Sequence, residues 1–558
     1  MFLVLKRFRN LGSALFYISI RLSCLILNEQ TVASHIGFCT HRIHICFTHR
    51  SFACEYGDKE GLMNFANTNK DIYCQHIRHV IENGFYKDNW DSLSSYRIPR
   101  WFEDAKFGIF IHWGLFSVPA FGNEWYSRNM YVQGSPEFEH HVKTYGPQRD
   151  FGYKDFIPMF TAEHFDPDSW AEIFANAGAR YVVPVAEHHD GFQMYQSFLS
   201  HYNAFEMGPK RDILGELKTA VEVKGMIFAA SSHRAEHHWF MGVGKEFDSD
   251  IKDPLSCGDF YWPSEKIQPD QQDLFSKPDP DEEFLIDWVC RTCEIVDRYQ
   301  PCILYFDWWI QHHAYKPYLR MIAAYYYNKG LEEGYPTAIC YKHDAMAFGS
   351  GIVDVERGKF SDAKPYHWQT DTAIARNSWC YTTSLDYKTS YEIICYLIDV
   401  VSKNGSLLLN VGPKADGTFA PEDIRILSDI GTWLHTNKEA IYDSRPWRFA
   451  QEGPTAEKEG QFSDGSAPTY TSEDFRFTAG HGAIYAACLH YPSDGRLTIH
   501  ALSRSEDPNQ PAFHGIIRDV QILGFPEKIT FFVDDDGLHF ETHSVSSEFP
   551  VIVKILTD

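Results

Sequence analysis

The sequence predicts an α/β fold, a (β/α)8-like TIM barrel followed by a C-terminal antiparallel β-sandwich. Helical stretches and short apolar strands alternate over roughly 350 residues, which is typical of parallel strands joined by helices. After about residue 445 the pattern changes to short alternating segments separated by Gly, Pro, Asp and Ser, as in a sandwich. Charged residues at strand ends favour a closed barrel, although the pattern alone also allows an open, doubly wound sheet.

Residues 1–75 differ in composition from the rest of the chain. In the first fifty positions Glu29 is the only acidic residue, whereas Lys and Arg recur. The apolar run over 11–27 has the character of a poor signal peptide, and Arg21 makes it too charged and too short for a stable membrane span. The interpretation we favour is a true start further along, for example at Met63, with disorder or a loose helix before the barrel. We therefore expect residues 1–75 to be dispensable.

The catalytic barrel is expected over residues 76–444. Its clearest unit is a helix over 166–178, which opens with the capping residue Asp166 and ends at Gly178, and a strand over 181–185 follows directly. Further strands are expected at 107–113, 226–230, 302–306, 338–341 and 407–411.

The β-sandwich is expected over residues 445–558. Its strands are predicted at 483–489, 497–501, 528–533 and 551–556. Because each sheet of a sandwich has one buried face and the two share a core, we expect this domain to support the barrel more than it binds substrate.

The composition excludes one class of partner and leaves two compartments open. The 558 residues are 44% hydrophobic, enough for a large core, and the net charge of −24 argues against nucleic acid as a partner. The 13 cysteines are odd in number and scattered, which favours reduced thiols in the cytoplasm; a secreted protein stays open if the N-terminus is a signal peptide. Cys290 and Cys293 lack a second pair for a zinc site, so we expect them in the core.

The strongest functional signal is the acid that ends the apolar run 301–306. Aromatic and aliphatic residues fill this buried strand, and Asp307, Trp308 and Trp309 follow it. An unpaired carboxylate is expensive to bury, so its position needs a reason. At the carboxyl end of a barrel strand, beside aromatic rings, such an acid suits the nucleophile of a sugar-cleaving enzyme. A helix N-cap is the alternative, with equal weight.

Other strand ends carry polar clusters. Histidines and acids gather at 112–126, 187–192 and 231–239. They raise the question of a metal, but adjacent histidines on a strand point to opposite faces, and histidine is also a common donor to sugar hydroxyls. In the segment 352–358, Glu356 or Asp354 could supply the second carboxyl that a retaining glycosidase needs about 5–5.5 Å from the first. A surface loop paired with Arg357 is the alternative.

Three long motifs follow one another along the chain. They are Lys106–Gly114 with Glu124-Trp125-Tyr126, then His188–Phe192, then Asp399–Pro413. Together they resemble the α-L-fucosidases of glycoside hydrolase family 29, over about residues 95–450. The resemblance implies a (β/α)8-like catalytic domain and a retaining, two-step mechanism without a metal or other cofactor.

The resemblance also implies roles for individual residues. Asp307 matches the nucleophile, and Glu356 is our choice of acid/base from its order in the chain after Asp307. The fucose-binding positions fall on His112, Glu124, Trp125, His188 and His189, and Trp379 lies in a pocket motif. The chain departs from the family at Cys380, where Gly is usual, at 233–239, where a Tyr-Ser pair is usual, and at Lys342-His343, where some members carry Arg.

We therefore expect an exo-acting retaining α-L-fucosidase that hydrolyses terminal α-L-fucosyl residues of glycans or glycoconjugates. Its partner is then a fucosylated oligosaccharide or glycoconjugate, and oligomerisation stays open. The alternatives are a retaining glycosidase for another α-configured sugar, such as an α-L-galactoside, or a catalytically dead carbohydrate-binding protein; a metal hydrolase ranks third.

Overall fold

The computed structural model describes residues 61–266, 273–465, 468–506, 509 and 512–558, with side chains from Lys70 onward. The expectations for residues 1–60 lie outside these ranges. Within them, no helix is long and apolar enough to cross a membrane.

Parallel strands form one sheet that closes into a barrel. The strands are β1 (Phe107–Ile111), β2 (Tyr181–Glu187), β3 (Ile227–Phe228), β4 (Ala230–Ser232), β5 (Leu304–Phe306), β6 (Ile339–Tyr341), β7 (Ile352–Asp354), β8 (Trp368–Ala373) and β9 (Gly405–Val411). Their order is β1-β9-β8-β7-β6-β5-β4-β2-β3, and β1 also pairs with β2, which closes the ring. Because β3 and β4 both pair with β2, they are two halves of one strand, and the predicted eight-strand barrel is confirmed.

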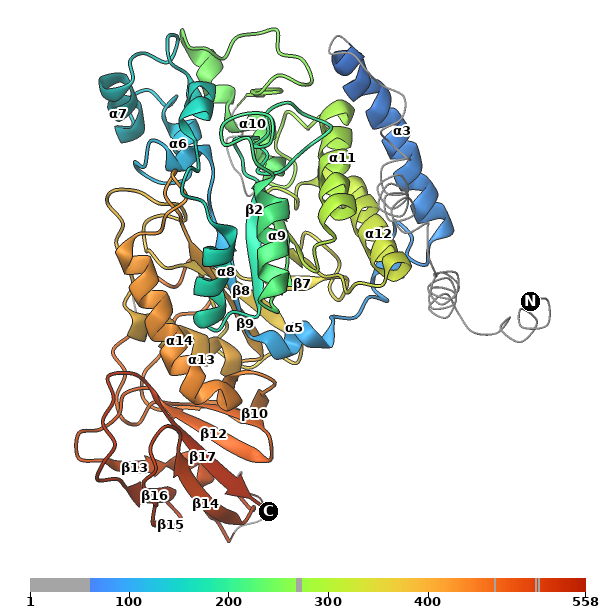
Figure 1. Ribbon diagram of the computed structural model, residues 1–558. Helices are drawn as coiled ribbons and strands as arrows, with labels where there is room; N and C mark the ends of the chain where they lie inside the picture. Colours follow the sequence, from blue (N-terminus) through green and yellow to red (C-terminus); the bar gives the residue numbers. More distant parts are fainter. Residues whose placement is uncertain (1–60, 267–272, 466–467, 507–508, 510–511) are drawn as a thin grey trace, which may run out of the picture. The chain divides into compact units, whose positions relative to one another are not determined.

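Helices connect most of the strands. They are α8 (Pro167–Asn176), α9 (Ile213–Val223), α11 (Glu282–Tyr299), α12 (Lys316–Glu333) and α13 (Ser390–Ser402), with α14 (Pro421–Ile441) after β9. Asp166 caps α8 as expected, since its side chain accepts hydrogen bonds from the first turn. Figure 1 shows α8 and α9 side by side across the strands. No helix joins β6 to β7 or β7 to β8 in the described residues, so the barrel is less regular than the ideal fold.

Side-chain alternation along the strands separates two apolar clusters. Phe110 and Tyr305 belong to a small cluster built from strands on all sides of the ring, which fills the barrel interior. Their neighbours Ile109 and Phe306 belong to the large cluster under the helices. Residues two positions apart share a face. A side chain two positions after Phe110 or Tyr305 therefore leaves the strand end on the interior side.

The C-terminal region is an antiparallel sandwich, as predicted. One sheet has the order β10 (Arg445–Glu452), β11 (Phe475–Gly480), β12 (Ala483–Cys488), β17 (Val551–Thr557) and β14 (Ile517–Ile522); the other has β13 (Arg496–Ile499), β16 (Leu538–Glu541) and β15 (Phe531–Val533). The two share an apolar core. α13 packs on β10 and β11, and α14 packs on β11. In this seam Arg476 donates to Asp399 at 2.5 Å and to Glu457 at 2.7 Å.

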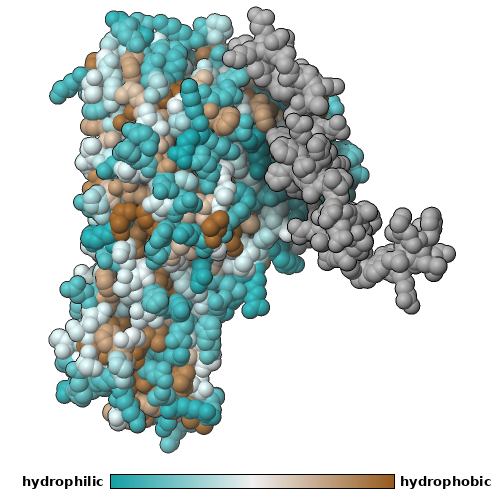
Figure 2. Space-filling view, in the orientation of Figure 1, coloured by the Kyte–Doolittle hydropathy of each residue, from teal (hydrophilic) through white to brown (hydrophobic). Residues whose placement is uncertain are grey.

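Polar residues cover most of the surface that is drawn in Figure 2, and apolar residues there form small separate groups. This distribution matches the clusters above, which bury most of the large apolar side chains of the described residues.

The helix α3 (Gly61–Asn83) crosses the boundary predicted at residue 76. Lys70 lies 2.5 Å from Asp287 of α11, and the Tyr73 hydroxyl donates to Asp297 at 2.5 Å. Tyr73 and Cys74 are buried with the barrel core. We therefore place the N-terminal edge of the barrel domain no later than Lys70.

A chain that begins at residue 76 should be less stable than one that begins at residue 66. It loses the buried ring of Tyr73 and also Lys70, one of the cations that contact Asp287, at a cost of about 3 kcal/mol. Thermal unfolding of the two forms measures the difference, and Tyr73→Phe, which keeps the ring, is the matched control. Equal midpoints for both forms would contradict this assignment.

Candidate active site

A cavity of about 340 Å³ opens at the carboxyl ends of the barrel strands. Small-molecule sites span about 300–1,000 Å³, so the cavity has the size of a site for a small ligand. Its lining includes Phe110, His112, Glu124, Trp125, His188, His189, His233, Glu236, Tyr305, Asp307, Trp308, Lys342, Glu356, Asp371, Trp379 and Phe462. Each of the eight barrel strands, or the loop that follows it, contributes a side chain that lines this cavity or bonds a residue that does.

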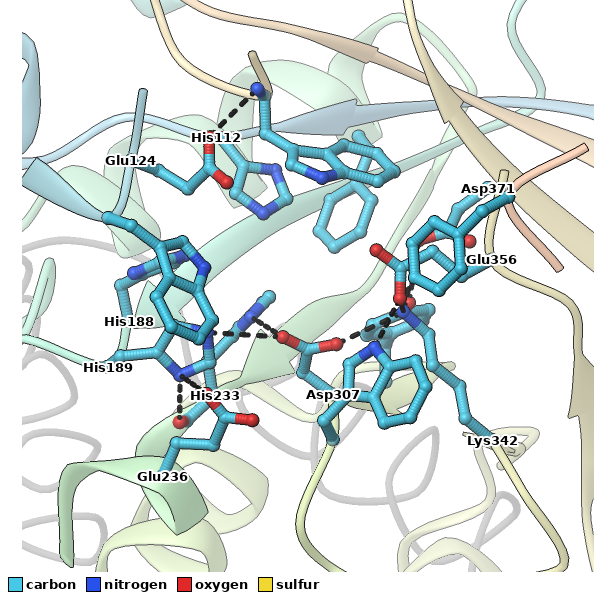
Figure 3. A pocket seen from close by; sticks show the side chains of 16 residues that line it. His112, Glu124, His188, His189, His233, Glu236, Asp307, Lys342, Glu356 and Asp371 are labelled. Atoms are coloured by element: carbon cyan, nitrogen blue, oxygen red, sulfur yellow. Dashed lines mark hydrogen bonds and ion pairs between the residues drawn. The ribbon is translucent and has the colours of Figure 1, made fainter. Parts of the chain in front are cut away.

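Asp307 lies at the centre of the cavity, directly after β5 (Figure 3). Its carboxylate accepts from His233 Nδ1 at 3.0 Å and contacts His189 Nε2 at 3.3 Å and Lys342 Nζ at 3.0 Å. Burial alone would raise the pKa of Asp307, but the charge of Lys342 and the bonds from His233 and His189 hold that pKa well below its usual range. The group is therefore an anion with three donors around it, and not a helix cap.

Glu356 stands across Lys342 from Asp307. Lys342 Nζ donates to Glu356 Oε2 at 2.7 Å and lies 3.5 Å from Asp371. Trp308 Nε1 also donates to the Glu356 carboxylate. Burial raises the pKa of Glu356 to about 7, against the lowering effect of Lys342. The two carboxyls of the site therefore differ in protonation, with Asp307 ionised and Glu356 able to hold a proton near neutrality.

His189 is the second cation of the site. Its Nδ1 donates to the backbone oxygen of His233 at 2.9 Å and lies 3.6 Å from Glu236. Burial lowers the pKa of His189, but Glu236 and Asp307 outweigh this effect and raise that pKa to about 9. Burial raises the pKa of Glu236 itself to about 7, so this carboxyl is a rival to Glu356 as a proton donor.

One wall of the cavity is held by Asn410 of β9. Asn410 Oδ1 accepts from His112 Nδ1 at 2.6 Å, and Asn410 Nδ2 donates to the backbone oxygen of Trp379 at 2.5 Å. Glu124 accepts from the backbone nitrogen of Trp379 at 3.0 Å. A side chain on Gly412 would come within 2.4 Å of the neighbouring loop, so only glycine lets this loop approach β9.

A buried ionic network lies behind the histidines. Glu187, which precedes His188, accepts from Arg234 at 2.6 Å and from Arg291 at 3.1 Å. Both arginines also contact Asp287 of α11, at 2.7 and 2.8 Å. Breaking one partner of such a network leaves an unpaired buried charge. The network therefore ties the loops after β2 and β4 to one helix.

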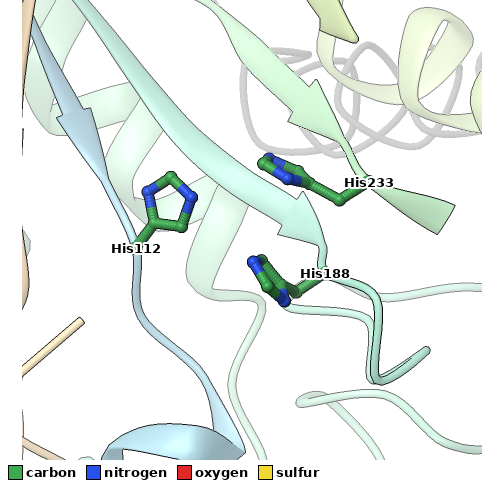
Figure 4. Close-up of side chains that lie close together, drawn as sticks. All are labelled: His112, His188 and His233. Atoms are coloured by element: carbon green, nitrogen blue, oxygen red, sulfur yellow. The ribbon is translucent and has the colours of Figure 1, made fainter. Parts of the chain in front are cut away.

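Three histidines converge from neighbouring strand ends (Figure 4). His112, His188 and His233 each offer a ring nitrogen within 4.8 Å of the others, a spacing that could hold a metal ion. Burial lowers the pKa of His112 and of His188 well below the usual range, so both are neutral. His233, however, already uses Nδ1 for Asp307 and Nε2 for Ser231 at 3.0 Å. A metal ion would have to displace one of these partners.

The structure brings all the predicted site residues to this one cavity. His112, Glu124, Trp125, His188, His189, Asp307, Glu356 and Trp379 all line it. Asp354, the alternative partner of Asp307, accepts from Gln369 at 2.8 Å in the barrel interior and does not line the cavity.

Several residues with evident roles were not predicted. His233 and Lys342 directly follow strands, so the position rule that found Asp307 applies to both of them. Asp371 lies inside β8, where this rule gives no signal. Phe462 comes from the loop between β10 and β11 of the sandwich. This loop therefore reaches the cavity, and the expectation that the sandwich supports the barrel more than it binds substrate stays a prediction.

Comparison with known proteins places the chain among sugar-cleaving enzymes. The family model described as "Alpha-L-fucosidase" matches residues 73–439. The tissue alpha-L-fucosidase of Bos taurus is 32% identical over 431 residues, which is 76% of this chain and 82% of that protein. The solved alpha-fucosidase of Thermotoga maritima is 28% identical, with a TM-score of 0.65, over 84% of this chain and all of that one. Its complex with fucose gives a TM-score of 0.64 over the same shares.

The purified chain should hold no stoichiometric metal at the three histidines, because His233 is committed to Asp307 and Ser231. Elemental analysis before and after dialysis against a chelator measures this, together with the thermal midpoint, which should not move. His188→Ala is the matched variant. One zinc per wild-type chain, absent from His188→Ala, would contradict the prediction.

Proposed function

We propose a retaining, exo-acting mechanism for this chain, which belongs to the alpha-L-fucosidase family and is a glycoside hydrolase. The substrate would be a terminal α-L-fucosyl residue of a glycan or glycoconjugate. One observation carries the choice of mechanism. Oxygens of Asp307 and Glu356 lie 3.0 and 2.7 Å from the same Lys342 nitrogen. Such oxygens cannot be separated by the roughly 6.5–9.5 Å of an inverting site, whereas about 5–5.5 Å suits a retaining one.

In the first step Asp307 would attack the anomeric carbon. Lys342, His189 and His233 keep its carboxylate ionised and fix its two oxygens, so that one oxygen would already face the anomeric carbon when the sugar binds. As the bond to the leaving group breaks, Glu356 donates its proton to the glycosidic oxygen, which leaves as a hydroxyl. The product is a covalent fucosyl ester of Asp307 and a free aglycone.

In the second step Glu356, now ionised, would take a proton from water. The hydroxide equivalent attacks the anomeric carbon from the side that the aglycone left, and Asp307 leaves as carboxylate. Two inversions give net retention. Because burial raises the pKa of Glu356 to about 7, the group can be an acid in one step and a base in the next at neutral pH.

Fucose itself would be bound by the neutral histidines and by Glu124. His112 has Nδ1 committed to Asn410, which leaves Nε2 for a sugar hydroxyl. Nδ1 of His188 is buried without a partner among the described residues, and a bound hydroxyl would satisfy it. Trp125 and Trp379 wall the cavity, and the C6 methyl group of fucose would rest against aromatic rings.

Asp307→Ala should lose turnover of an activated aryl α-L-fucoside by several orders of magnitude, and azide should partly restore it. Azide would occupy the space of the lost carboxylate, so the product should be the β-L-fucosyl azide. In Glu356→Ala the ester still forms, and azide should give the α-L-fucosyl azide. NMR of the products measures both.

Glu236→Ala is the matched control for that experiment, because Glu236 is equally buried and lines the same cavity. It should give no azide adduct. An α-azide from Glu236→Ala and none from Glu356→Ala would transfer the acid/base role to Glu236. Near-native turnover in Asp307→Ala would end the assignment of the nucleophile.

The pH profile should depend on Lys342. The kcat/KM of an unactivated aryl fucoside should fall as the pH rises through about 7, because Glu356 must be protonated in the first step. Lys342 lowers the pKa of both carboxyls, so Lys342→Met should move both limbs of the profile to higher pH. Lys342→Arg, which keeps the charge, should leave the limbs near their wild-type positions. Unmoved limbs in Lys342→Met would contradict this coupling.

A further inference from the structure

We propose that Phe462 and Trp308 form a subsite for the first sugar of the aglycone, a pyranose ring that presents its apolar C–H face to them. The proposal rests on the proposed function, because it takes Glu356 as the residue that protonates the leaving oxygen. It adds a binding site on the other side of the scissile bond from the fucose pocket, and it draws one side chain from outside the barrel.

Phe462 is held against the acid/base loop by backbone pairing. Its nitrogen donates to the backbone oxygen of Glu356 at 3.0 Å, and the nitrogens of Gly460 and Asp464 donate to Lys359 and Arg357 at 2.9 and 3.1 Å. A Cβ on Gly358 would come within 2.0 Å of the Gly460 oxygen, so the close approach requires glycine there. The sandwich loop thus lies in register on the segment that carries Glu356.

The side chain of Asp464 anchors the same loop. It binds the ammonium of Lys388 at 2.5 Å and lies 3.6 Å from Arg357. The side chains of these three residues are at most 10% exposed, and such a paired network is costly to open. The contacts of Gly460 before Phe462 and of Asp464 after it therefore fix the position of Phe462.

Two aromatic rings meet beside the Glu356 carboxyl. The rings of Phe462 and Trp308 are nearly parallel, with 13° between their planes and 6.0 Å between their centres. Trp308 also donates its indole N–H to Glu356 and packs at 4.1 Å on the ring of His343. Phe462 is 57% exposed although it is a large apolar side chain that lines the cavity. Folding alone leaves this ring uncovered, and a ligand would cover it.

The direction of the aglycone follows from the chemistry. The leaving oxygen has to contact Glu356, and the fucose ring has to lie over Asp307 among histidines that are almost fully buried. The next sugar therefore extends from Glu356 toward the open side of the cavity, where Phe462 and Trp308 stand. A flat apolar surface buries the C–H face of a pyranose, while the hydroxyls at the rim of that ring stay in water.

The test compares substrates with and without an aglycone ring. In Phe462→Ala the kcat/KM of an α-L-fucosyl disaccharide should fall about ten-fold, from the apolar contact that is lost. The kcat/KM of α-L-fucosyl fluoride, which carries no aglycone ring, and the inhibition constant of L-fucose should change less than about two-fold. Phe462→Tyr, which keeps the ring, should resemble the wild type. Because Phe462 is exposed, the variant should fold, and its thermal midpoint checks this.

The outcomes separate the two proposals. An unchanged disaccharide reaction in Phe462→Ala, or an equal fall for disaccharide and fluoride, would overturn the subsite while the proposed function stands. A wild-type enzyme that releases fucose from neither substrate would overturn the proposed function and the subsite that rests on it.

Discussion

The site depends on the contacts of one buried cation, the ammonium group of Lys342, with the carboxylates around it. It contacts Asp307, Glu356 and Asp371 within 3.5 Å, and its side chain is 2% exposed. Buried carboxylates this close would repel one another, and a lone buried cation would be costly as well. Each charge is therefore stable only in the presence of the others. The same contacts set the spacing of Asp307 and Glu356 and hold the pKa of both below the values that burial alone would give, so structure and electrostatics share one cause.

The barrel makes this arrangement available because its strands are parallel and adjacent. The ladder pairs Tyr305 with Cys340 and Tyr341 with Val353, so the residues that follow β5, β6 and β7 emerge side by side at one edge. On the opposite side, the network around Glu187 and Asp287 holds the loops with the histidines. The two halves meet at Asp307, which receives a lysine from one and histidines from the other (Figure 3).

The sequence was informative wherever function follows position in a strand. A charged residue at the end of a buried run identified Asp307. Glu356 was chosen from its order in the chain, and the family motifs identified the other predicted residues, all of which line the same cavity. Contacts between segments that lie far apart in the chain give no comparable pattern in the sequence, so they could not be predicted from it. Phe462 lies in an irregular loop more than a hundred residues after Glu356, and backbone pairing with a close approach of Gly358 to Gly460 brings the two together. The packing of α3 on α11 is also not visible in the sequence, because Lys70 and its partner Asp287 lie far apart in the chain.

Backbone strain shows how the separate loops are held. Trp309, His343, Arg357 and Phe462 all have positive φ, between 45° and 80°, and the first three follow Asp307, Lys342 and Glu356 within two positions. Such conformations cost non-glycine residues about 1–3 kcal/mol each and persist only where surrounding contacts impose them. For Phe462 and Arg357 these contacts run between barrel and sandwich, through the backbone pairing and Asp464. The geometry around Glu356 is therefore a property of both domains together, although every polar side chain that lines the cavity comes from the barrel.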